Sequence, residues 1–240
     1  MGLRRTLKSS LERLMNRQVY IARTLPRGIN ISYDIRNAFK NYSCKVIIDV
    51  GANIGLFTQQ MLIDFPKSEF YCCEPVSSTY NVLAKRFESE FNVRCFQLAL
   101  SDIERKGFMA LTKKSVTNYL IDDEHLGSDN EFKTEPVMVS TLDQFCQKHH
   151  IEQISYLKID TEGEDLAVLK GSRTMLEQQC IDFIQVEAGF TSSNNYHIPF
   201  EVLQQYLESY QYFLFGVYAQ EKLNRWASPV FVSPRLPNSK

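Results

Sequence analysis

The sequence lacks several features that would assign it to a common class of protein. None of its apolar runs reaches the roughly 20 residues that a bilayer-spanning helix needs, and Arg and Lys interrupt the N-terminus too often for a signal peptide. The formal net charge of -1 gives no global basic field, so we expect no nucleic acid as a partner. No C-x-x-C pair occurs among the six cysteines, which argues against a zinc site or a disulfide framework. We therefore expect a cytoplasmic protein with reduced thiols.

Two glycine motifs that bind nucleotide phosphates are also absent. Gly51 and Gly55 stand four residues apart, which fits neither G-x-G-x-x-G nor G-x-x-x-x-G-K-[ST]. They nevertheless follow a β-branched run at 46–50 and precede an apolar helical pattern. This order predicts a strand, a tight turn and a helix. At such a turn Gly51 allows the backbone to approach a ligand closely, and Gly55 allows the helix to pack tightly on the strand.

The acid before this turn indicates the kind of ligand. The carboxylate of Asp49 would repel a pyrophosphate, whereas it would attract the ammonium and sulfonium groups of S-adenosylmethionine. Glu74 follows a second expected strand at 69–73, where such folds bind the ribose hydroxyls. Because dinucleotides and S-adenosylmethionine both contain ribose, Glu74 does not choose between them. An NAD(P)-dependent oxidoreductase is therefore still an alternative at this point.

Strands and helices alternate along the chain in the pattern of a doubly wound, mostly parallel α/β sheet. The 240 residues, 44% of them hydrophobic, are enough to bury the core of one domain with an appendage. Further strands are expected at 93–100, 154–159 and 180–186, and an antiparallel C-terminal hairpin at 212–218 and 229–232. Helices are expected at 54–64, 77–91, 141–150, 166–176 and 199–210. The segment 107–120 is interpreted as an antiparallel excursion, and 121–136 as a polar loop.

The first 27 residues differ in charge from the rest of the chain. They contain seven Arg and Lys residues against Glu12 alone, and their leucines recur at helical spacing. We interpret residues 1–44 as a basic amphipathic helical extension and residues 45–240 as the main domain. The extension either packs over the domain or meets a membrane surface or another anionic partner through residues 1–27.

Acidic side chains follow two of the predicted strands. Asp160 and Glu162 come after the strand at 154–159, which should lie beside the first strand, and Glu187 comes after the strand at 180–186. The three carboxylates should therefore face the cofactor pocket, where they could take the proton of a substrate hydroxyl. Glu164 and Asp165 are assigned instead to the positive end of the next helix.

The same acids have other possible uses. They could share a proton, hold a polyol or bind a divalent metal. Because no ordered ligand spacing is present, we expect no metal site. His197, in the loop after Glu187, is a possible base, although a lone loop histidine is more often just exposed.

Several motifs together resemble the FkbM-type methyltransferases, from about Lys45 to Val232. The motifs are Asp49-Val-Gly-Ala-Asn-Ile-Gly55, Glu74-Pro75, Ala99-Leu-Ser-Asp102, Leu157-Lys-Ile-Asp-Thr-Glu-Gly-Glu164, Val168-Leu-Lys-Gly171 and Phe215-Gly-Val-Tyr218. The resemblance implies a class I (Rossmann-like) fold and S-adenosylmethionine as cofactor. It also implies O-methylation of a hydroxyl on a sugar, glycan or natural product.

The resemblance places Asp49, Gly51, Asn53 and Gly55 around the methionine part of the cofactor, Glu74 on the ribose and the Ser101 turn near the adenine. Ala52 and Asp102 complete the expected cofactor-binding set. Two positions depart from the family pattern. Thr161 stands where the family often has Val, and residues 115–120 match a Ser/Thr-rich family loop only loosely.

Three hypotheses follow from the sequence. The first is an S-adenosylmethionine-dependent O-methyltransferase with Asp160, Glu162 and Glu187 as catalytic residues. The second is an NAD(P)-dependent oxidoreductase, against which Asp49 and the glycine spacing argue. The third is a methyltransferase fold kept as a binding module, with the basic extension recruiting a partner.

Overall fold

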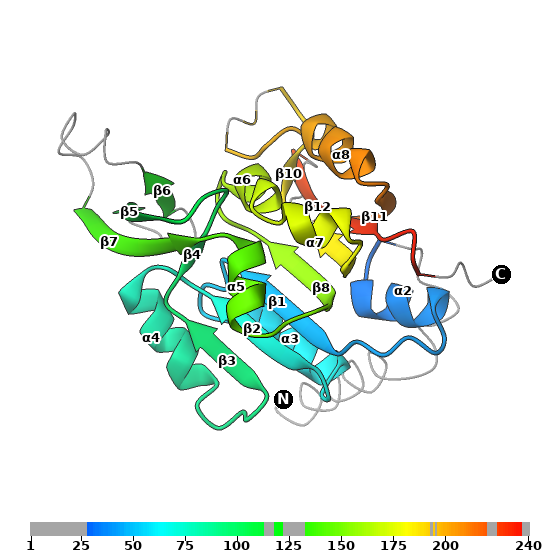
Figure 1. The fold of residues 1–240 in the computed structure, drawn as a ribbon, viewed down its shortest axis with the longest axis horizontal. Helices are drawn as coiled ribbons and strands as arrows, with labels where there is room; N and C mark the ends of the chain where they lie inside the picture. The colour runs from blue at the N-terminus through cyan, green and yellow to red at the C-terminus, as the bar shows by residue number, and fades with distance from the viewer. Residues whose placement is uncertain are drawn as a thin grey trace, which may run out of the picture.

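The computed structural model describes residues 28–112, 118–121, 133–192, 194, 196–219 and 225–236. The basic segment 1–27 lies outside the described residues. The main sheet has the order β10-β12-β9-β8-β1-β2-β3, and β11 pairs with the free side of β12 (Figure 1). Its parallel strands are β1 (Val46–Val50), β2 (Glu69–Cys73), β3 (Val93–Phe96), β8 (Ile154–Ile159) and β9 (Ile181–Gln185). Its antiparallel strands are β10 (Ala188–Gly189), β11 (Phe213–Ala219) and β12 (Trp226–Val232).

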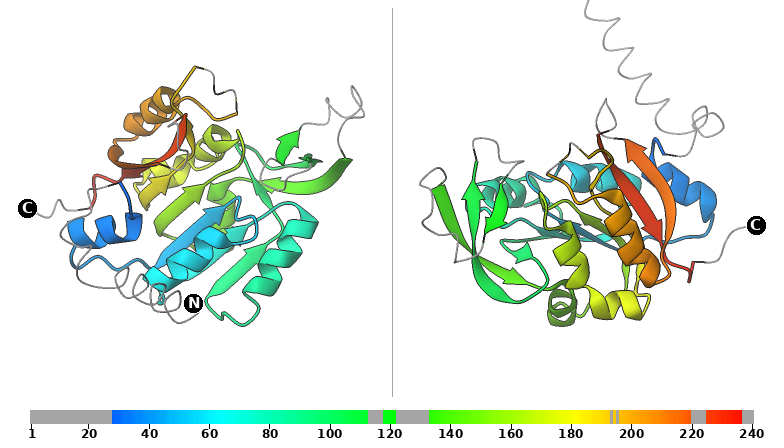
Figure 2. Two further views of the ribbon diagram at one scale, coloured as in Figure 1. Left: turned by 180° about the vertical axis from the view of Figure 1, so that it is seen from behind. Right: turned by 90° about the horizontal axis from the view of Figure 1, so that it is seen from above.

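Helices cover both faces of this sheet. Figure 1 shows α5 (Leu142–Lys148), α6 (Asp165–Lys170) and α7 (Arg173–Glu177) in front of it, with α8 (Phe200–Ser209) beside them. The reverse view in Figure 2 shows α3 (Leu56–Asp64) and α4 (Ser77–Arg86), with α2 (Ile31–Ala38) next to the sheet edge. The predicted doubly wound α/β class, with its antiparallel C-terminal hairpin, is confirmed.

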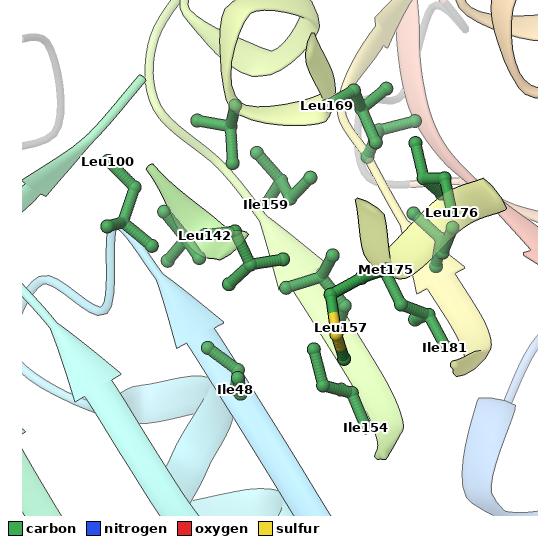
Figure 3. Close-up of a cluster of buried hydrophobic side chains, with 14 of the residues drawn as sticks. Ile48, Leu100, Leu142, Ile154, Leu157, Ile159, Leu169, Met175, Leu176 and Ile181 are labelled. Atoms are coloured by element: carbon green, nitrogen blue, oxygen red, sulfur yellow. The ribbon is translucent and has the colours of Figure 1, made fainter. Parts of the chain in front are cut away.

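The alternation of side chains along each strand explains why the sheet needs two helical layers. Ile48 and Leu157 belong to the cluster on the side of α5 to α8, part of which Figure 3 shows. Ile47 and Tyr156 belong to the cluster on the opposite side, with the side chains of α2, α3 and α4. Because both faces of a doubly wound sheet are buried, its central strands are mostly apolar, and every residue of β8 is buried, Ser155 and Lys158 included.

A second sheet stands beside the first and was only partly predicted. It has the order β4-β7-β5-β6 and contains β4 (Ala99–Leu100), β5 (Arg105–Leu111), β6 (Tyr119–Ile121) and β7 (Lys133–Ser140). The antiparallel excursion is confirmed by the β5–β6 pairing. The expected single strand at 93–100 is wrong, because β3 pairs with β2 whereas β4 pairs with β7. The expected loop at 121–136 is also wrong in part, since β7 begins at Lys133 with a polar, solvent-facing half.

The helix expected at 166–176 is divided into α6 and α7. Gly171 ends α6, and a Cβ atom at this position would lie 2.1 Å from the carbonyl oxygen of Ser101. The hydroxyl of Ser172 donates to the carbonyl of Val168 at 2.6 Å. The chain therefore turns at a position where the backbone just after β4 lies against Gly171. Within the described part of the chain, no helix is both long enough and apolar enough to cross a membrane.

Candidate active site

A pocket opens at the carboxyl ends of β1, β2 and β8, where open α/β sheets bind their ligands. The second sheet closes one side of it through β5 and β6. The lining residues are Val50, Gly51, Asn53, Glu74, Pro75, Leu98, Ala99, Leu100, Met109, Asn118, Leu120, Asp160, Thr161, Glu162 and Glu164.

The glycine turn after β1 forms the floor of this pocket. Gly51 has φ of 72°, and a Cβ atom on it would lie 1.9 Å from the carbonyl oxygen of Asp160. The backbone N–H groups of Gly51 and Ala52 both donate to the carbonyl of Cys73, at 3.0 and 2.9 Å. Gly55, with φ of 82°, lies against Phe87, which a Cβ atom would reach at 2.4 Å. Only glycine fits the first position, because the ends of β1 and β8 lie too close for any side chain.

Glu74 is buried and faces the pocket from the end of β2. Its two carboxylate oxygens accept the backbone N–H groups of Asn53 and Val76, both at 3.0 Å. Burial raises the pKa of Glu74, and these two hydrogen bonds act in the opposite direction. The carboxylate therefore connects the glycine turn to the start of α4 and keeps further lone pairs for a ligand hydroxyl.

Asp49 lies beneath the pocket and is not among its lining residues. Its carboxylate is fully buried, accepts the hydroxyl of Thr58 at 2.7 Å and lies 3.2 Å from the ammonium of Lys158. The structure thus gives Asp49 a cationic partner within the protein, Lys158. The attraction of a positively charged ligand by Asp49 stays a prediction.

Lys158 belongs to the motif at 157–164, but the sequence did not predict it as a site residue. Its ammonium lies 2.9 Å from the carboxylate of Asp160 and donates to the carbonyl of Gly51 at 3.3 Å. Burial lowers the pKa of Lys158, but Asp160 and Asp49 outweigh burial and raise it overall. The lysine therefore stays charged beneath the glycine turn and fixes the end of β8 against it. A lysine inside a buried apolar strand was the signal that could have identified it.

The three acids expected at the strand ends do come together. One carboxylate oxygen each from Asp160, Glu162 and Glu187 lies within 4.8 Å of the other two. Burial, together with the nearby charges of Asp160 and Glu187, raises the pKa of Glu162 to about 7. Glu162 also has φ of 52°, an uncommon backbone conformation for a residue other than glycine. Such clusters of perturbed carboxyl groups are typical of functional sites.

Asp165 connects the two acidic loops. Its carboxylate accepts the backbone N–H and the hydroxyl of Thr161, at 3.2 and 2.9 Å, and the backbone N–H of Glu187 at 3.1 Å. Its side chain thus holds the loop after β8 against the loop after β9. Asp165 is the first residue of α6, as expected from its assignment to the positive end of that helix. Its contacts between the two loops were not predicted.

Glu164 and Ser101 form a second connection. Glu164 is the N-cap residue of α6, but its side chain makes no capping hydrogen bond. Instead it lines the pocket and accepts the hydroxyl of Ser101 at 2.9 Å. Ser101 is buried, and neither it nor Asp102 is among the lining residues. The structure therefore places Glu164 in the pocket wall and Ser101 behind it.

The apolar wall was missed by the sequence reasoning. Leu98, Leu100, Met109 and Leu120 come from or adjoin the second sheet, whose existence the sequence only suggested. Of the Ser/Thr-rich segment at 115–120, residues 115–117 lie outside the described residues, whereas Asn118 and Leu120 line the pocket. The pocket thus has a carboxylate-rich side at β8 and an apolar side at the second sheet.

The carboxylate cluster has the spacing of a cation site, since hard divalent cations prefer carboxylate oxygens. Two of its members already have positive or hydrogen-donating partners, because Lys158 contacts Asp160 and His197 contacts Glu187. We therefore interpret the cluster as a site for hydroxyl groups and protons.

Comparison with known proteins gives matches to methyltransferases. A family model described as the methyltransferase FkbM domain matches residues 49–214. Methyltransferase 1 of Beauveria bassiana (strain ARSEF 2860) is 26% identical over 142 residues, which cover 52% of this chain and 57% of that protein. Methyltransferase sdnD of Sordaria araneosa is 27% identical over 172 residues, which cover 58% of this chain and 63% of that protein. The chain thus matches less than two thirds of the length of either relative.

Solved structures show the same fold at low sequence identity. The crystal structure of methyltransferase FkbM from Methylobacillus flagellatus KT has a TM-score of 0.56 and 15% identity, covering 79% of this chain and 44% of that one. The structure of M. capricolum TrmK in complex with S-adenosyl-homocysteine has a TM-score of 0.50 and 10% identity, covering 89% of this chain and 73% of that one.

Proposed function

The chain belongs to the FkbM methyltransferase family, and on this premise we propose that it transfers a methyl group from S-adenosylmethionine to a substrate hydroxyl. The acceptor in this proposal is a hydroxyl of a sugar, glycan or natural product. The observation that carries it is the cluster of Asp160, Glu162 and Glu187 at the edge of the pocket. A hydroxyl must lose its proton when its oxygen is methylated, and a positioned carboxylate can take that proton.

The pocket residues fit the cofactor of the family. S-adenosylmethionine supplies an electrophilic methyl group on a sulfonium centre. Gly51 leaves room for close approach of a ligand to the backbone, and Glu74 offers carboxylate lone pairs to the ribose hydroxyls. The apolar side chains of Leu98, Leu100 and Met109 form a surface suited to a flat base. These residues bind and orient the cofactor, and the carboxylates in the loops after β8 and β9 perform the proton chemistry.

The proposed methyl transfer needs only one carboxylate of the protein, which accepts the proton of the acceptor hydroxyl. An oxygen lone pair of the acceptor forms the new bond to the methyl carbon, and the electron pair of the broken carbon–sulfur bond stays on sulfur. The proton of the acceptor moves to a carboxylate of the cluster and then to solvent. Several carboxylates side by side also accept hydrogen bonds from neighbouring hydroxyls, which supports a polyol-like acceptor.

Other parts of the proposal concern partners. We propose that nucleic acid is not the acceptor, because the net charge of -1 gives no global basic field. We also propose that the basic segment 1–27 contacts an anionic surface, for which its seven Arg and Lys residues are the support. A methyltransferase fold that only binds is the competing function, since family membership alone does not establish turnover.

Calorimetric titration with S-adenosylhomocysteine, NAD and NADP tests the cofactor, and transfer from labelled S-adenosylmethionine to a panel of sugars and hydroxylated natural products tests the reaction. We expect that S-adenosylhomocysteine binds, that NAD and NADP do not, and that at least one hydroxyl compound becomes labelled. Binding without labelling of any acceptor would favour the binding module. Binding of a dinucleotide alone would overturn the proposed function.

A further inference from the structure

His197 contacts one of the three acids directly. Its Nε2 atom lies 3.2 Å from a carboxylate oxygen of Glu187, and the two side chains are only 13% and 10% exposed. The imidazole stacks on the indole of Trp226, with ring centroids 5.5 Å apart and an interplanar angle of 21°. The ring is therefore held in place from its face as well as from its edge, unlike the exposed loop histidine that the sequence suggested.

Asn194 fixes the other edge of the same ring. Its amide oxygen accepts the backbone N–H groups of Tyr196 and His197, at 3.0 and 3.1 Å, and its amide nitrogen donates to the carbonyl of Arg225 at 3.3 Å. These contacts set the orientation of the amide group. Its nitrogen lies 2.9 Å and its oxygen 3.1 Å from Nδ1 of His197.

The carboxylate of Glu187 decides which ring nitrogen carries hydrogen, because an ionised carboxylate only accepts. In neutral His197 the single ring hydrogen is therefore on Nε2 and points at Glu187, and Nδ1 accepts from the amide nitrogen of Asn194. In protonated His197, Nδ1 donates to the amide oxygen instead, and Nε2 again donates to Glu187. Glu187 therefore receives a hydrogen bond from His197 in both protonation states.

We propose that Glu187 is the base that takes the proton of the acceptor hydroxyl, and that His197 and Asn194 are positioning residues that orient its carboxylate for this step. The inference rests on the proposed function and selects one acid from the cluster. One oxygen of Glu187 is bound by His197, and the carboxylate reaches within 4.8 Å of Asp160 and Glu162 at the pocket edge. The proton is transferred from the acceptor oxygen to the carboxylate of Glu187, and no further reactant is needed.

The surrounding charges support this choice over Glu162. Glu187 faces Asp160, Glu162, Asp165 and His197, and His197 faces the carboxylates of Glu187, Glu162 and Asp165. Burial raises the pKa of Glu187, whereas the hydrogen bond from His197 lowers it. Within the described part of the chain no hydrogen-bond donor contacts the carboxylate of Glu162, and its pKa is raised to about 7. The hydrogen bond from His197 thus favours the ionised form of Glu187, whereas burial and the charges of Asp160 and Glu187 favour the protonated form of Glu162.

Two substitutions of His197 separate orientation from packing. His197→Phe keeps a ring to stack on Trp226 but removes the N–H that Glu187 accepts, whereas His197→Gln retains an amide N–H. We expect His197→Phe to lower kcat by about 100-fold, the lower range for loss of a base. The KM of the acceptor and the affinity for S-adenosylhomocysteine should stay within about threefold of wild type, well below the tenfold change that 1.4 kcal/mol represents.

The dependence of kcat on pH distinguishes the proposed role of His197 from a purely structural one. A purely structural role would leave the acidic limb of this profile unchanged. Without the N–H of His197 the pKa of Glu187 should rise, so the acidic limb of kcat should shift to higher pH in His197→Phe. His197→Gln should recover most of the rate and the wild-type limb. His150→Gln is the matched control, because His150 is exposed and follows α5, outside the loops that carry these residues. An unchanged kcat and limb in His197→Phe, or a His197→Gln variant as slow as His197→Phe, would overturn the inference.

Nitrogen NMR of the full chain, which follows the titration of the His197 ring, tests the contact between His197 and Glu187 without any methyl acceptor. The pKa of His197 should lie above its ordinary value, with the hydrogen bond that His197 donates to Glu187 as the main cause, and it should fall in Glu187→Gln. The neutral ring should be the Nε2–H tautomer, because the carboxylate of Glu187 accepts that hydrogen. A titration of His197 unaffected by Glu187→Gln would overturn the inference even for an active enzyme. An intact pair in a wild type that methylates no hydroxyl would overturn the proposed function instead.

Discussion

The ammonium of Lys158 lies 3.2 Å from the carboxylate of Asp49, and the two residues are direct partners in the parallel pairing of β8 with β1. Both side chains are buried on the face of the sheet that α3 covers, and Phe57 of α3 lies 5.7 Å from the ammonium. The pair therefore occupies the centre of the sheet, directly below the glycine turn.

Removing one member of this pair should destabilise the fold. Lys158→Met leaves the buried carboxylate of Asp49 without its cation, and the loss of one partner of a buried ion pair costs about 3–5 kcal/mol. Urea unfolding followed by circular dichroism measures the change. Arg173→Met is the control, because the exposed Arg173–Glu177 pair should contribute less than about 1 kcal/mol. A loss in Lys158→Met as small as that of the control would contradict the importance of the buried pair.

The glycine turn should tolerate no side chain at Gly51. A Cβ atom there would lie 1.9 Å from the carbonyl oxygen of Asp160, so Gly51→Ala must separate the ends of β1 and β8. We expect loss of S-adenosylhomocysteine binding in calorimetry. Gly163→Ala is the matched control: it also has a positive φ, of 108°, but its Cβ would meet nothing closer than 3.5 Å. The control should show only backbone strain of about 1–3 kcal/mol and keep the ligand. Equal affinity in the two variants would argue against Gly51 as a binding position.

The sequence predicted the central sheet and the meeting of the acids because both depend on local patterns. Mostly apolar, β-branched runs marked β1 and β8, and acids directly after parallel strands must share one edge of the sheet. Asp160, Glu162 and Glu187 could therefore be placed together before any coordinates were known. The likeness in motif spacing added the cofactor to this picture.

The remaining features depend on contacts between distant segments. Asp49 was expected in the pocket because nothing in the sequence around it reveals that Lys158 is its partner, 109 positions further along the chain by numbering. The wall formed by Met109 and Leu120 could not be placed, since β7 begins with a polar segment that resembles a loop. The hydrogen bonds between Asn194 and His197 require a loop conformation that no periodicity encodes.

Glu74 should contribute to cofactor affinity through its charge. Glu74→Gln keeps the size of the side chain but turns one acceptor oxygen into a donor, which conflicts with the N–H of Asn53 or Val76 and weakens any bond to a ribose hydroxyl. A lost hydrogen bond to a charged group costs about 1.5–3 kcal/mol, or roughly 10- to 100-fold in affinity. Calorimetry with S-adenosylhomocysteine measures it. Glu69→Gln, at the exposed opposite end of β2, should bind like wild type. Wild-type affinity in Glu74→Gln would remove Glu74 from the ribose site.

Removal of metal ions should leave turnover unchanged. Asp160 already contacts Lys158 and Glu187 already contacts His197, so a cation at the cluster would compete with two existing partners. We expect dialysis against EDTA to alter neither kcat nor the KM of the acceptor. A loss of rate that added Mg²⁺ restores would instead show that the three carboxylates hold a cation during the reaction.

The raised pKa of Glu162 should make the protein less stable as pH rises. In the unfolded chain this carboxyl group has its ordinary pKa of about 4.5, whereas in the folded protein the pKa is about 7. Between these values the folded state binds more protons than the unfolded state, so the free energy of unfolding decreases with increasing pH. Below about 4.5 both states are protonated, and above about 7 the destabilisation is complete.

Glu162→Gln should abolish this contribution, because the amide stays neutral at every pH. Its free energy of unfolding relative to wild type should be constant below about pH 4.5, increase up to about pH 7 and then level off. Urea unfolding at pH 4, 5.5, 7 and 8 measures the difference, with the exposed Glu152→Gln as control. A difference that does not change with pH would show that Glu162 is not forced to keep its proton. The same variant should retain S-adenosylhomocysteine binding, since a neutral side chain at this position is the state that the folded protein already favours below pH 7.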